Sequence, residues 1–179
     1  MVRRWRFARF TPIVQGFESS IHEVPSGGFC LSVFLLISPS DRPSEVLWGR
    51  PEPNAEWELL AGYRSAGVSD REWLLPASIL HFGESPDDAA KRIIRDQLAR
   101  ARVSLSRPKV VSEVYSPRGR PEWKDHWDVR FLYEGQTDDV PPAGPMWAEL
   151  AFLNPAQVRS QPVGRGHREV LRSRRRVSQ

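Results

Sequence analysis

Residues 80–98 read like the centre of a phosphate-processing site from which some acidic residues have been removed. Glu84 precedes a predicted helix, and Arg92, Asp96 and Gln97 lie within it. Carboxylates on one helix face hold a divalent cation, which neutralises a diphosphate so that water can attack it. An arginine can also bind phosphate directly. Glu84, Arg92, Asp96 and Gln97 are the residues of this stretch that could take part in such chemistry.

The helix that positions these residues has a clear beginning. Ser85 is a suitable N-cap, Pro86 suits the first helical position, and Asp87 and Asp88 favour the positive end of the helix dipole. The predicted helix therefore begins at Pro86, directly after Glu84.

Apolar spacing predicts which side of this helix faces the core. Ala90, Ile94, Leu98 and Ala101 follow at intervals of four, four and three residues, which is typical of one core-facing stripe. The remaining residues of interest then share a separate face, where we expect any chemistry. These residues are Arg92, Ile93, Asp96 and Gln97.

Several strands surround this helix in the sequence. Residues 29–38 and 45–50 read as strands that form a hairpin, and residues 110–116 and 126–135 read as two more strands. Residues 146–158 predict a further strand and a short helix, and residues 51–71 read as an insertion. We therefore expect an α/β (α+β) fold, with a mixed β-sheet packed by helices.

This order of elements and its motifs resemble the Nudix fold family. The family's box reads G, five residues, E, seven residues and R-E-U-x-E-E-x-G-U, where U is a bulky aliphatic residue, and a W-x-L-P stretch precedes it. The matching residues are Trp73, Leu75, Pro76, Gly83, Glu84, Ser85, Ala89, Ala90, Arg92, Ile94 and Leu98. The resemblance covers roughly residues 28–158 and implies a Nudix-like mixed sheet sandwiched between helices.

The departures from the box fall on its chemistry. Ser78 replaces the box glycine, and Ala99 replaces the closing glycine. The three helix acids of the family correspond to Ile93, Asp96 and Gln97, so one carboxylate remains, shorter by a methylene. Ile93 cannot bind a metal ion, and Gln97 offers a neutral carbonyl only. The degenerate box predicts that no metal site survives.

If any metal site did survive, it would depend on few residues. Glu84 and Asp96 are the residual metal candidates, and acids outside the helix would have to complete the site. The candidates for that role are Glu113, Asp128, Asp138 and Asp139, with His81 at a position where the family often has an acid. We expect no cofactor; magnesium or manganese enters only if the chain is a hydrolase.

Arg92 has two interpretations. In the structural one, it pairs with a nearby acid, such as Asp88 or Asp96 one turn away on the helix, and holds the loop to the helix. In the functional one, it contacts phosphate without a metal ion. The structural interpretation is favoured, because ion pairs on helix surfaces are common.

Positive charge is concentrated at the two ends of the chain. The net charge is +4, but residues 1–10 carry +4 and residues 159–179 carry +6, which leaves the middle at −6. Arginine pairs with phosphate oxygens, and the aromatic residues interleaved near the N-terminus can stack on bases. The candidate phosphate-binding residues are Arg3, Arg4, Arg6, Arg168, Arg172, Arg174, Arg175 and Arg176. The alternative is a pair of solvated basic ends.

These patterns divide the chain into three parts. Residues 1–27 form a basic N-terminal arm, residues 28–158 the Nudix-like domain and residues 159–179 a basic C-terminal tail. A single cysteine, Cys30, excludes an intramolecular disulfide and is expected to pack as a small buried hydrophobe. No apolar run has the length of a membrane span, and no signal-peptide pattern is present, so we expect a cytoplasmic protein without membrane contact.

The sequence thus favours a non-catalytic Nudix-like binding or scaffold protein whose basic ends contact RNA or a ribonucleoprotein. The alternative is a divergent metal-dependent pyrophosphohydrolase of the Nudix type, acting on a nucleoside diphosphate-linked substrate. A nucleotide ligand and an acidic protein partner are further partner classes that the composition leaves open.

Overall fold

The computed structural model describes residues 29–53, 71–115, 126–164 and 166–176 of the chain. In chain order, the described elements are β1 (Phe29–Pro39), β2 (Val46–Pro51), β3 (Ala77–Ile79), α2 (Pro86–Gln97), β4 (Ser104–Leu105), β5 (Lys109–Tyr115), β6 (His126–Thr137), β7 (Trp147–Leu153), α3 (Pro155–Ser160) and α4 (His167–Arg176). The N-terminal arm and most of the predicted insertion lie outside the described residues. No described helix combines the length and apolar character that crossing a bilayer requires.

β1 lies inside a five-stranded sheet, and its side chains are buried on both faces of that sheet. Residues 32–39 are all buried, as suits a strand with helices on both sides of its sheet. β1 runs parallel to β6, from Phe29 opposite Trp127 to Pro39 opposite Thr137. β3 is antiparallel to β1, and β4 and β5 are antiparallel to β6. The sheet is therefore mixed.

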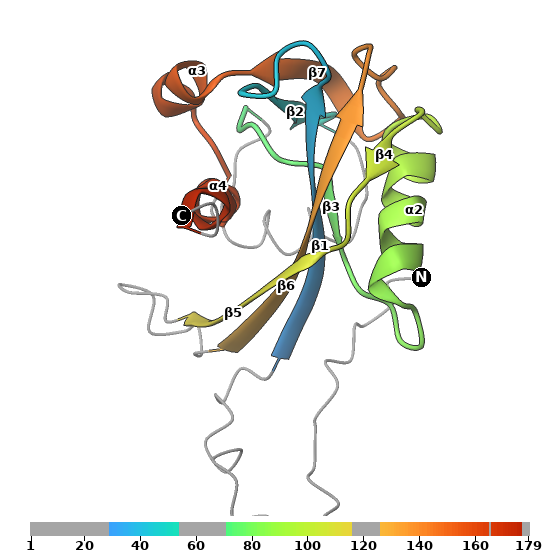
Figure 1. Ribbon diagram of the computed structural model, residues 1–179, viewed down its shortest axis with the longest axis vertical. Coiled ribbons are helices and arrows are strands. Elements are labelled where there is room, and N and C mark those ends of the chain that lie inside the picture. The colour runs from blue at the N-terminus through green and yellow to red at the C-terminus, as the bar shows by residue number, and fades with distance from the viewer. Residues whose placement is uncertain (1–28, 54–70, 116–125, 165, 177–179) are drawn as a thin grey trace, which may run out of the picture.

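Helices cover the two faces of this sheet (Figure 1). Because strand side chains alternate between faces, Val33 and Leu35 of β1 pack in the cluster that includes α2. Phe34 and Leu36 pack on the other face, in the cluster that includes Val170 of α4. The predicted α/β (α+β) architecture, a mixed sheet sandwiched between helices, is confirmed.

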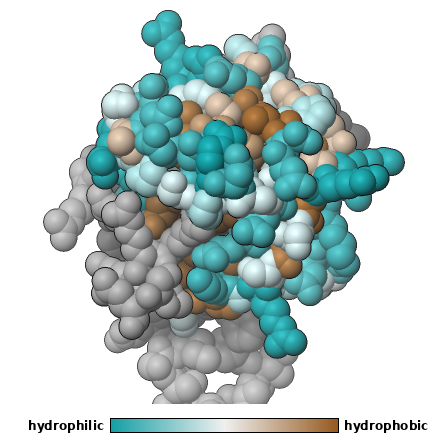
Figure 2. Space-filling view, turned by 45° about the horizontal axis from the view of Figure 1, so that its top comes forward, coloured by the Kyte–Doolittle hydropathy of each residue, from teal (hydrophilic) through white to brown (hydrophobic). Residues whose placement is uncertain are grey.

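The predicted hairpin between residues 29–38 and 45–50 is wrong. β2 pairs antiparallel with β7 in a separate two-stranded sheet. β6 occupies one edge of β1 along its whole length, and β3 occupies the other edge at Ser32–Phe34, whereas β2 takes β7 as its partner. Gly49 lets the β2–β7 sheet pack closely, because a Cβ at this position would overlap the ring of Trp147. Figure 2 turns this end of the molecule toward the viewer and shows small hydrophobic areas separated by hydrophilic side chains.

The remaining predicted strands are confirmed. Residues 110–116 correspond to β5, residues 126–135 to β6, and residues 146–158 contain β7 and α3. Asn154 caps α3, since its side chain accepts hydrogen bonds from the backbone N–H groups of Ala156 and Gln157. Cys30 is half-buried, and burial raises the pKa of its thiol to about 11, which disfavours the reactive thiolate.

The basic segment 159–179 contributes a packed helix to the fold. His167 and Val170 of α4 are buried, and Val170 belongs to a core cluster of the five-stranded sheet. The imidazole Nδ1 of His167 accepts a hydrogen bond from the backbone N–H of Leu75 at 2.8 Å. The ring also meets the ring of Phe34 edge to face. α4 is therefore held to the body by a specific contact as well as by apolar packing.

Candidate functional site

The loop before α2 and the first turn of that helix are built as the sequence predicts. Ser85 caps the helix, because its Oγ accepts a hydrogen bond from the backbone N–H of Asp88 at 3.1 Å. Pro86 occupies the first helical position. Gly83 has a φ of +79°, a left-handed conformation that favours glycine. The chain thus turns sharply at Gly83 and places Glu84 directly before the cap.

Glu84 and Arg92 form a bidentate ion pair that closes this loop onto the helix. Arg92 Nε lies 2.7 Å from Glu84 Oε1, and its second terminal nitrogen lies 2.8 Å from Oε2. This geometry fits the structural interpretation, in which Arg92 pairs with a nearby acid and holds the loop to the helix, but the acid is Glu84 instead of Asp88 or Asp96. Glu84 precedes the helix, so it faces the guanidinium group from the loop, which i,i+4 spacing along the helix cannot reveal.

The remaining donors of Arg92 are also used within the protein. One terminal nitrogen donates to the hydroxyl of Ser78 at 2.9 Å, and the other donates to the carbonyl of Ile79 at 2.9 Å. Ser78 is the residue that replaces the box glycine, so its hydroxyl supplies an acceptor that glycine lacks. Arg92 therefore connects α2 to β3 and to the loop between them. These hydrogen bonds stabilise the fold.

The carboxylate of Glu84 is charged but already engaged. The hydrogen bond from Arg92 lowers the pKa of Glu84 from 4.5 to about 2. The backbone N–H of His81 also donates to Glu84 Oε2 at 3.0 Å. His81 thus contributes its backbone to the loop. A histidine at this position supplies an imidazole and not the carboxylate that the family often has there.

Ile93 lies in the core, and the predicted separate face of α2 is wrong on this point. The Ile93 side chain is 1% exposed and packs with Val33, Leu35 and Tyr133. Ile94, which the stripe placed in the core, is only partly buried. The reason is that the apolar residues of α2 form two adjacent stripes, and the sheet covers the stripe that contains Ile93.

Gln97 anchors the end of α2 to β3. Its side chain is 3% exposed, and Nε2 donates to the carbonyl of Ala77 at 2.7 Å. Its Oε1 is buried and has no hydrogen-bond partner among the described residues. Gly144 packs closely here, because a Cβ at that position would approach the carbonyl oxygens of Asp96 and Gln97. Gln97 therefore also lies in the interior, although it was predicted to lie on a face separate from the core-facing stripe.

Asp96 is the one acid left at the three acidic box positions of the helix, and it stays near the surface. Arg95 Nε and its second terminal nitrogen donate to the two carboxylate oxygens at 2.6 and 2.9 Å. The hydrogen bond from Arg95 lowers the pKa of Asp96. The carboxylate is therefore charged and paired with its chain neighbour.

The acids proposed to complete a metal site do not join Glu84 and Asp96. Glu113 and Asp128 both pair with Arg130, on the sheet face opposite α2. Asp138 and Asp139 are exposed in the segment after β6. Within the described ranges, no group of three or more His, Cys, Asp or Glu residues is arranged to hold a metal ion.

Arg130 and His167 are the buried polar residues that sequence analysis missed. Arg130 is 5% exposed and bridges Asp128 and Glu113. The alternation in residues 126–135 places Arg130 on the side opposite the aromatic residues, which resembled a solvent-exposed face. His167 lies within residues 159–179, which the sequence analysis distinguished from the domain only by their positive charge. Neither position carries a local signal of burial.

The structure describes only part of the predicted phosphate-binding set. Arg168 is partly exposed and donates to the carbonyl of Gln161 at 3.3 Å. Four further arginines lie on α4, at positions 172, 174, 175 and 176. Helical spacing puts positions 168, 172 and 175 on one side of this helix. Arg3, Arg4 and Arg6 lie outside the described residues.

The residues at the box positions do not fit a divalent metal ion. Such an ion needs several oxygen ligands, commonly carboxylates, that are free to bind it. Both oxygens of Glu84 accept hydrogen bonds from Arg92, and those of Asp96 accept from Arg95. Ile93 and Gln97 are buried. The magnesium chemistry that the family resemblance implies therefore lacks its ligand set at these positions.

No protein-family model matches the sequence, and neither does any curated protein. Solved structures are similar in fold. The E. coli dihydroneopterin triphosphate pyrophosphohydrolase is 11% identical at a TM-score of 0.54, over 80% of this chain and 92% of that one. A Nudix hydrolase from M. smegmatis, RenU, is 15% identical at a TM-score of 0.55, over 85% and 86% of the two chains.

A third similar structure is the Nudix domain of Shewanella oneidensis NrtR, complexed with ADP ribose. It is 15% identical at a TM-score of 0.54, over 83% of this chain and 88% of that one. At this level of identity the likeness shows the fold alone, since one fold hosts many functions. The chain has the Nudix fold, as the resemblance of its motifs predicted.

Proposed function

We propose that this chain is a non-catalytic binding module built on the Nudix fold, and that its basic residues contact RNA or a ribonucleoprotein. The observation that carries the first part is the use of the box positions. Glu84, Arg92, Ile93 and Gln97 all serve the packing of α2 on the sheet. Residues that hold the fold together in this way leave no free ligand set for a metal ion.

The energies support this assignment. Freeing Glu84 for a metal ion would leave the guanidinium of Arg92 partly buried without its partner, and breaking such a pair costs about 3–5 kcal/mol in a fully buried site. Rotating Gln97 away from the Ala77 carbonyl would strand a buried acceptor, at about 1–3 kcal/mol. The binding of a metal ion would have to offset both of these free-energy costs before the site could bind a substrate.

The basic residues favour a polyanion as the partner. α4 holds five arginines and a single acid, Glu169. A guanidinium group binds phosphate oxygens through two parallel hydrogen bonds, which suits an RNA backbone. The NrtR domain is described as bound to ADP ribose, so a nucleotide is a further ligand class for the same tests. The cytoplasm is the expected compartment for such a partner.

RNA binding is tested with α4 substitutions, because deleting the helix would also remove His167 and Val170 from the core. The double variant Arg172→Gln/Arg175→Gln is titrated with a fluorescent single-stranded RNA at several salt concentrations. Each lost phosphate contact reduces the slope of log affinity against log salt by about 0.7, so the pair reduces it by about 1.4. Thermal melting checks that the variant is folded.

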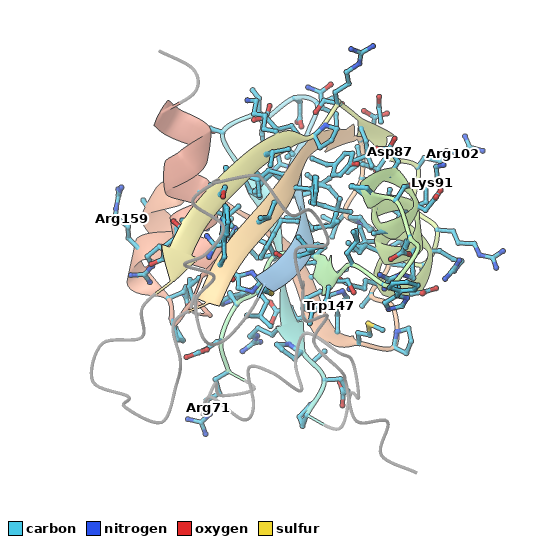
Figure 3. The ribbon with its side chains drawn as sticks, turned by 90° about the horizontal axis from the view of Figure 1, so that it is seen from below. Arg71, Asp87, Lys91, Arg102, Trp147 and Arg159 are labelled. Atoms are coloured by element: carbon cyan, nitrogen blue, oxygen red, sulfur yellow. The ribbon has the colours of Figure 1, made fainter. Side chains whose placement is uncertain are left out.

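The matched control removes two arginines from the other side of the molecule. Arg100 and Arg102 are exposed in the segment after α2, and Figure 3 shows Arg102 on the α2 side, away from Arg159 of α3. Arg100→Gln/Arg102→Gln should leave the slope unchanged. An affinity that does not depend on salt would contradict the proposal. Equal effects of the two double variants would contradict the assignment to α4.

The hydrolase alternative has its own test. The chain is incubated with magnesium or manganese and a panel of nucleoside diphosphate-linked compounds, and released phosphate and nucleotide are measured. The proposal predicts no release above the level of an Asp96→Ala variant. Metal-dependent turnover that Asp96→Ala abolishes would establish a pyrophosphohydrolase instead. If the chain bound an acidic protein and did not bind RNA, the partner would be an acidic protein instead.

A further inference from the structure

Within the part of the chain that the structure describes, β5 forms an edge of the five-stranded sheet. Among the described strands it pairs only with β6, and it lies on the outer side of that strand (Figure 1). An edge strand presents a row of backbone N–H and C=O groups that can pair with another strand. Val110 is 59% exposed, and Ser112 and Glu113 are also exposed. The described side chains of β5 are thus partly exposed, and no described strand pairs with its outer edge.

The charged side chains of β5 lie on one face of the sheet. Val111 packs in the core cluster on the α4 side, and alternation puts Lys109 and Glu113 on that same face. Lys109 pairs with Glu134 of β6 at 3.1 Å, and Glu113 pairs with Arg130 of β6. Each pair leaves its β5 side chain partly exposed. One positive and one negative side chain thus flank Val111, two residues away on either side.

We propose that β5 pairs antiparallel with β5 of a second copy, about a two-fold axis at Val111. This register places Lys109 opposite Glu113 of the second copy, and the symmetry makes this pair twice. Val110 faces Ser112, and Val111 faces Val111. Opposite charges directly across two strands are favourable, whereas like charges are not.

The charge pattern also disfavours the neighbouring register, in which the two-fold axis lies at Ser112. A two-fold axis at Ser112 would place Val111 opposite Glu113 and leave both lysines without an acid. In the Val111 register, the pairs extend the ion pairs already present, since Lys109 of one copy meets Glu113 of the other beside Arg130. Two such sheets form one continuous sheet, with both α4 helices on the same side. A contact limited to one strand pair is small, so the dimer depends on concentration.

Sedimentation velocity on the full chain over a range of concentrations tests the dimer. Val110→Lys adds a charge at the edge, where natural sheets use lysine to prevent pairing, and should weaken dimerisation at least tenfold. Val140→Lys is the matched control, since Val140 is also exposed, at 49%, but lies outside β5. A monomer at every concentration, or equal effects of the two variants, would overturn the proposal.

A cross-link tests the register. In a Cys30→Ser background, Val111→Cys places two thiols opposite each other at a separation that a disulfide spans, whereas Ser112→Cys places them on a longer diagonal. Oxidation should convert Val111→Cys, and not Ser112→Cys, into a species of twice 20.5 kDa. Equal yields from the two variants would exclude this register. A monomer that captures an added peptide of the β5 sequence without self-association would show that the edge accepts other strands instead.

Discussion

Glu84 and Arg92 illustrate how residues of a catalytic motif can serve structure. Arg92 donates to Glu84, to the Ser78 hydroxyl and to the Ile79 carbonyl, and so joins a loop, a strand and a helix. In a metal-binding enzyme, the carboxylates of such a motif must stay available to the ion. Here the ion pair alone accounts for why an acid and an arginine occupy these two positions.

The first prediction concerns the pH dependence that Glu84 creates. Its pKa is lowered to about 2, so the pair stabilises the fold above the unfolded pKa of 4.5, and this contribution is lost as the pH falls toward 2. Glu84→Gln should reduce the free energy of unfolding by about 1–3 kcal/mol at pH 7. Urea unfolding at pH 7 and at pH 3 measures both values.

The control for Glu84→Gln is Asp41→Asn, which removes a charge from a side chain that is 75% exposed. Asp41→Asn should change the free energy of unfolding by less than about 0.5 kcal/mol at either pH. If Glu84→Gln lost as much stability at pH 3 as at pH 7, its ion pair would not be the cause.

The second prediction separates a buried core position from a lapsed metal site. Ile93→Glu places a carboxylate among Val33, Leu35 and Tyr133, and should destabilise the protein by about 3–5 kcal/mol. Ile93→Val keeps the apolar character and should cost about 1 kcal/mol. Urea unfolding measures both. A stable Ile93→Glu variant that hydrolyses a diphosphate would show instead that position 93 faces a usable site.

The residues at the box positions could be identified from the sequence, but the direction that they face could not. Gln97 looks exposed in a sequence, because glutamine is polar, and only the Ala77 carbonyl at 2.7 Å explains its burial. Ile93 follows Arg92 and precedes Ile94, so two apolar stripes were possible. The choice between them depends on where the sheet lies, which is a tertiary property that local spacing does not contain.

At the scale of elements, the end of α2 shows the effect of a missing glycine. Ala99 has a φ of 47° and Arg100 a φ of 61°, both in the left-handed region. The backbone N–H of Arg100 donates to the carbonyl of Ile94, which closes the helix. Glycine adopts this conformation without strain, whereas alanine does not. The backbone at the end of α2 is therefore strained, because neither Ala99 nor Arg100 is a glycine.

The third prediction follows from this conformation. Ala99→Gly should stabilise the protein by about 1 kcal/mol, because the left-handed region costs an alanine about that amount. The same change at Ala156, inside α3, should destabilise it by about 0.5 kcal/mol, because a helical φ favours alanine. Thermal and urea unfolding measure both variants. Two changes of equal sign would show that strain at position 99 is not the cause.

The fourth prediction concerns the docking of α4. Burial lowers the pKa of His167 from 6.5 to about 3, so the folded protein holds this ring neutral while the unfolded chain takes up a proton below pH 6.5. Stability therefore falls as the pH drops from 6.5 toward 3, by about 2 kcal/mol between pH 6.5 and pH 5. His167→Asn retains an acceptor for the Leu75 N–H and should remove this dependence.

Urea unfolding at pH 7 and pH 5 measures this change for the parent chain and for His167→Asn. The variant should be less stable at pH 7, because its smaller side chain leaves a cavity. Its stability should change much less between the two pH values. A parent chain whose stability is the same at pH 5 as at pH 7 would show that the ring is not held neutral.

The strands show where sequence analysis succeeds and fails for whole elements. The type and place of β1, β5, β6 and β7 could be predicted, because apolar runs and turn residues are local signals. The partner of β2 could not, because that choice depends on which strand edges are free. The α4 helix, within a segment distinguished by charge, carries its apolar signal in only a few residues such as Val170.

At the scale of the whole molecule, the proposed β5 dimer and the basic α4 helix are predicted to act together. Pairing at β5 puts both α4 helices on the same side of one sheet, so a long polyanion can bind both at once. The fifth prediction is that an RNA of about 30 nucleotides binds more tightly once dimers form, whereas one of about 5 nucleotides does not.

The avidity prediction is measured by titration above and below the dimerisation concentration. Val110→Lys should remove the advantage of the longer RNA and leave the binding of the shorter one unchanged. An advantage that persists in Val110→Lys would show that one copy binds the whole RNA. This outcome would leave the role of α4 intact and would contradict its coupling to the β5 edge.

The pairing of β1 with β6 also sets a condition on synthesis. Phe29 and Trp127 are partners, although they lie about 100 residues apart in the chain. At translation rates of 5–20 residues per second, the ribosome needs roughly 5–20 s to make the strand that completes the centre of the sheet. During this interval the β1 segment of the nascent chain has no central partner to cover its apolar side chains.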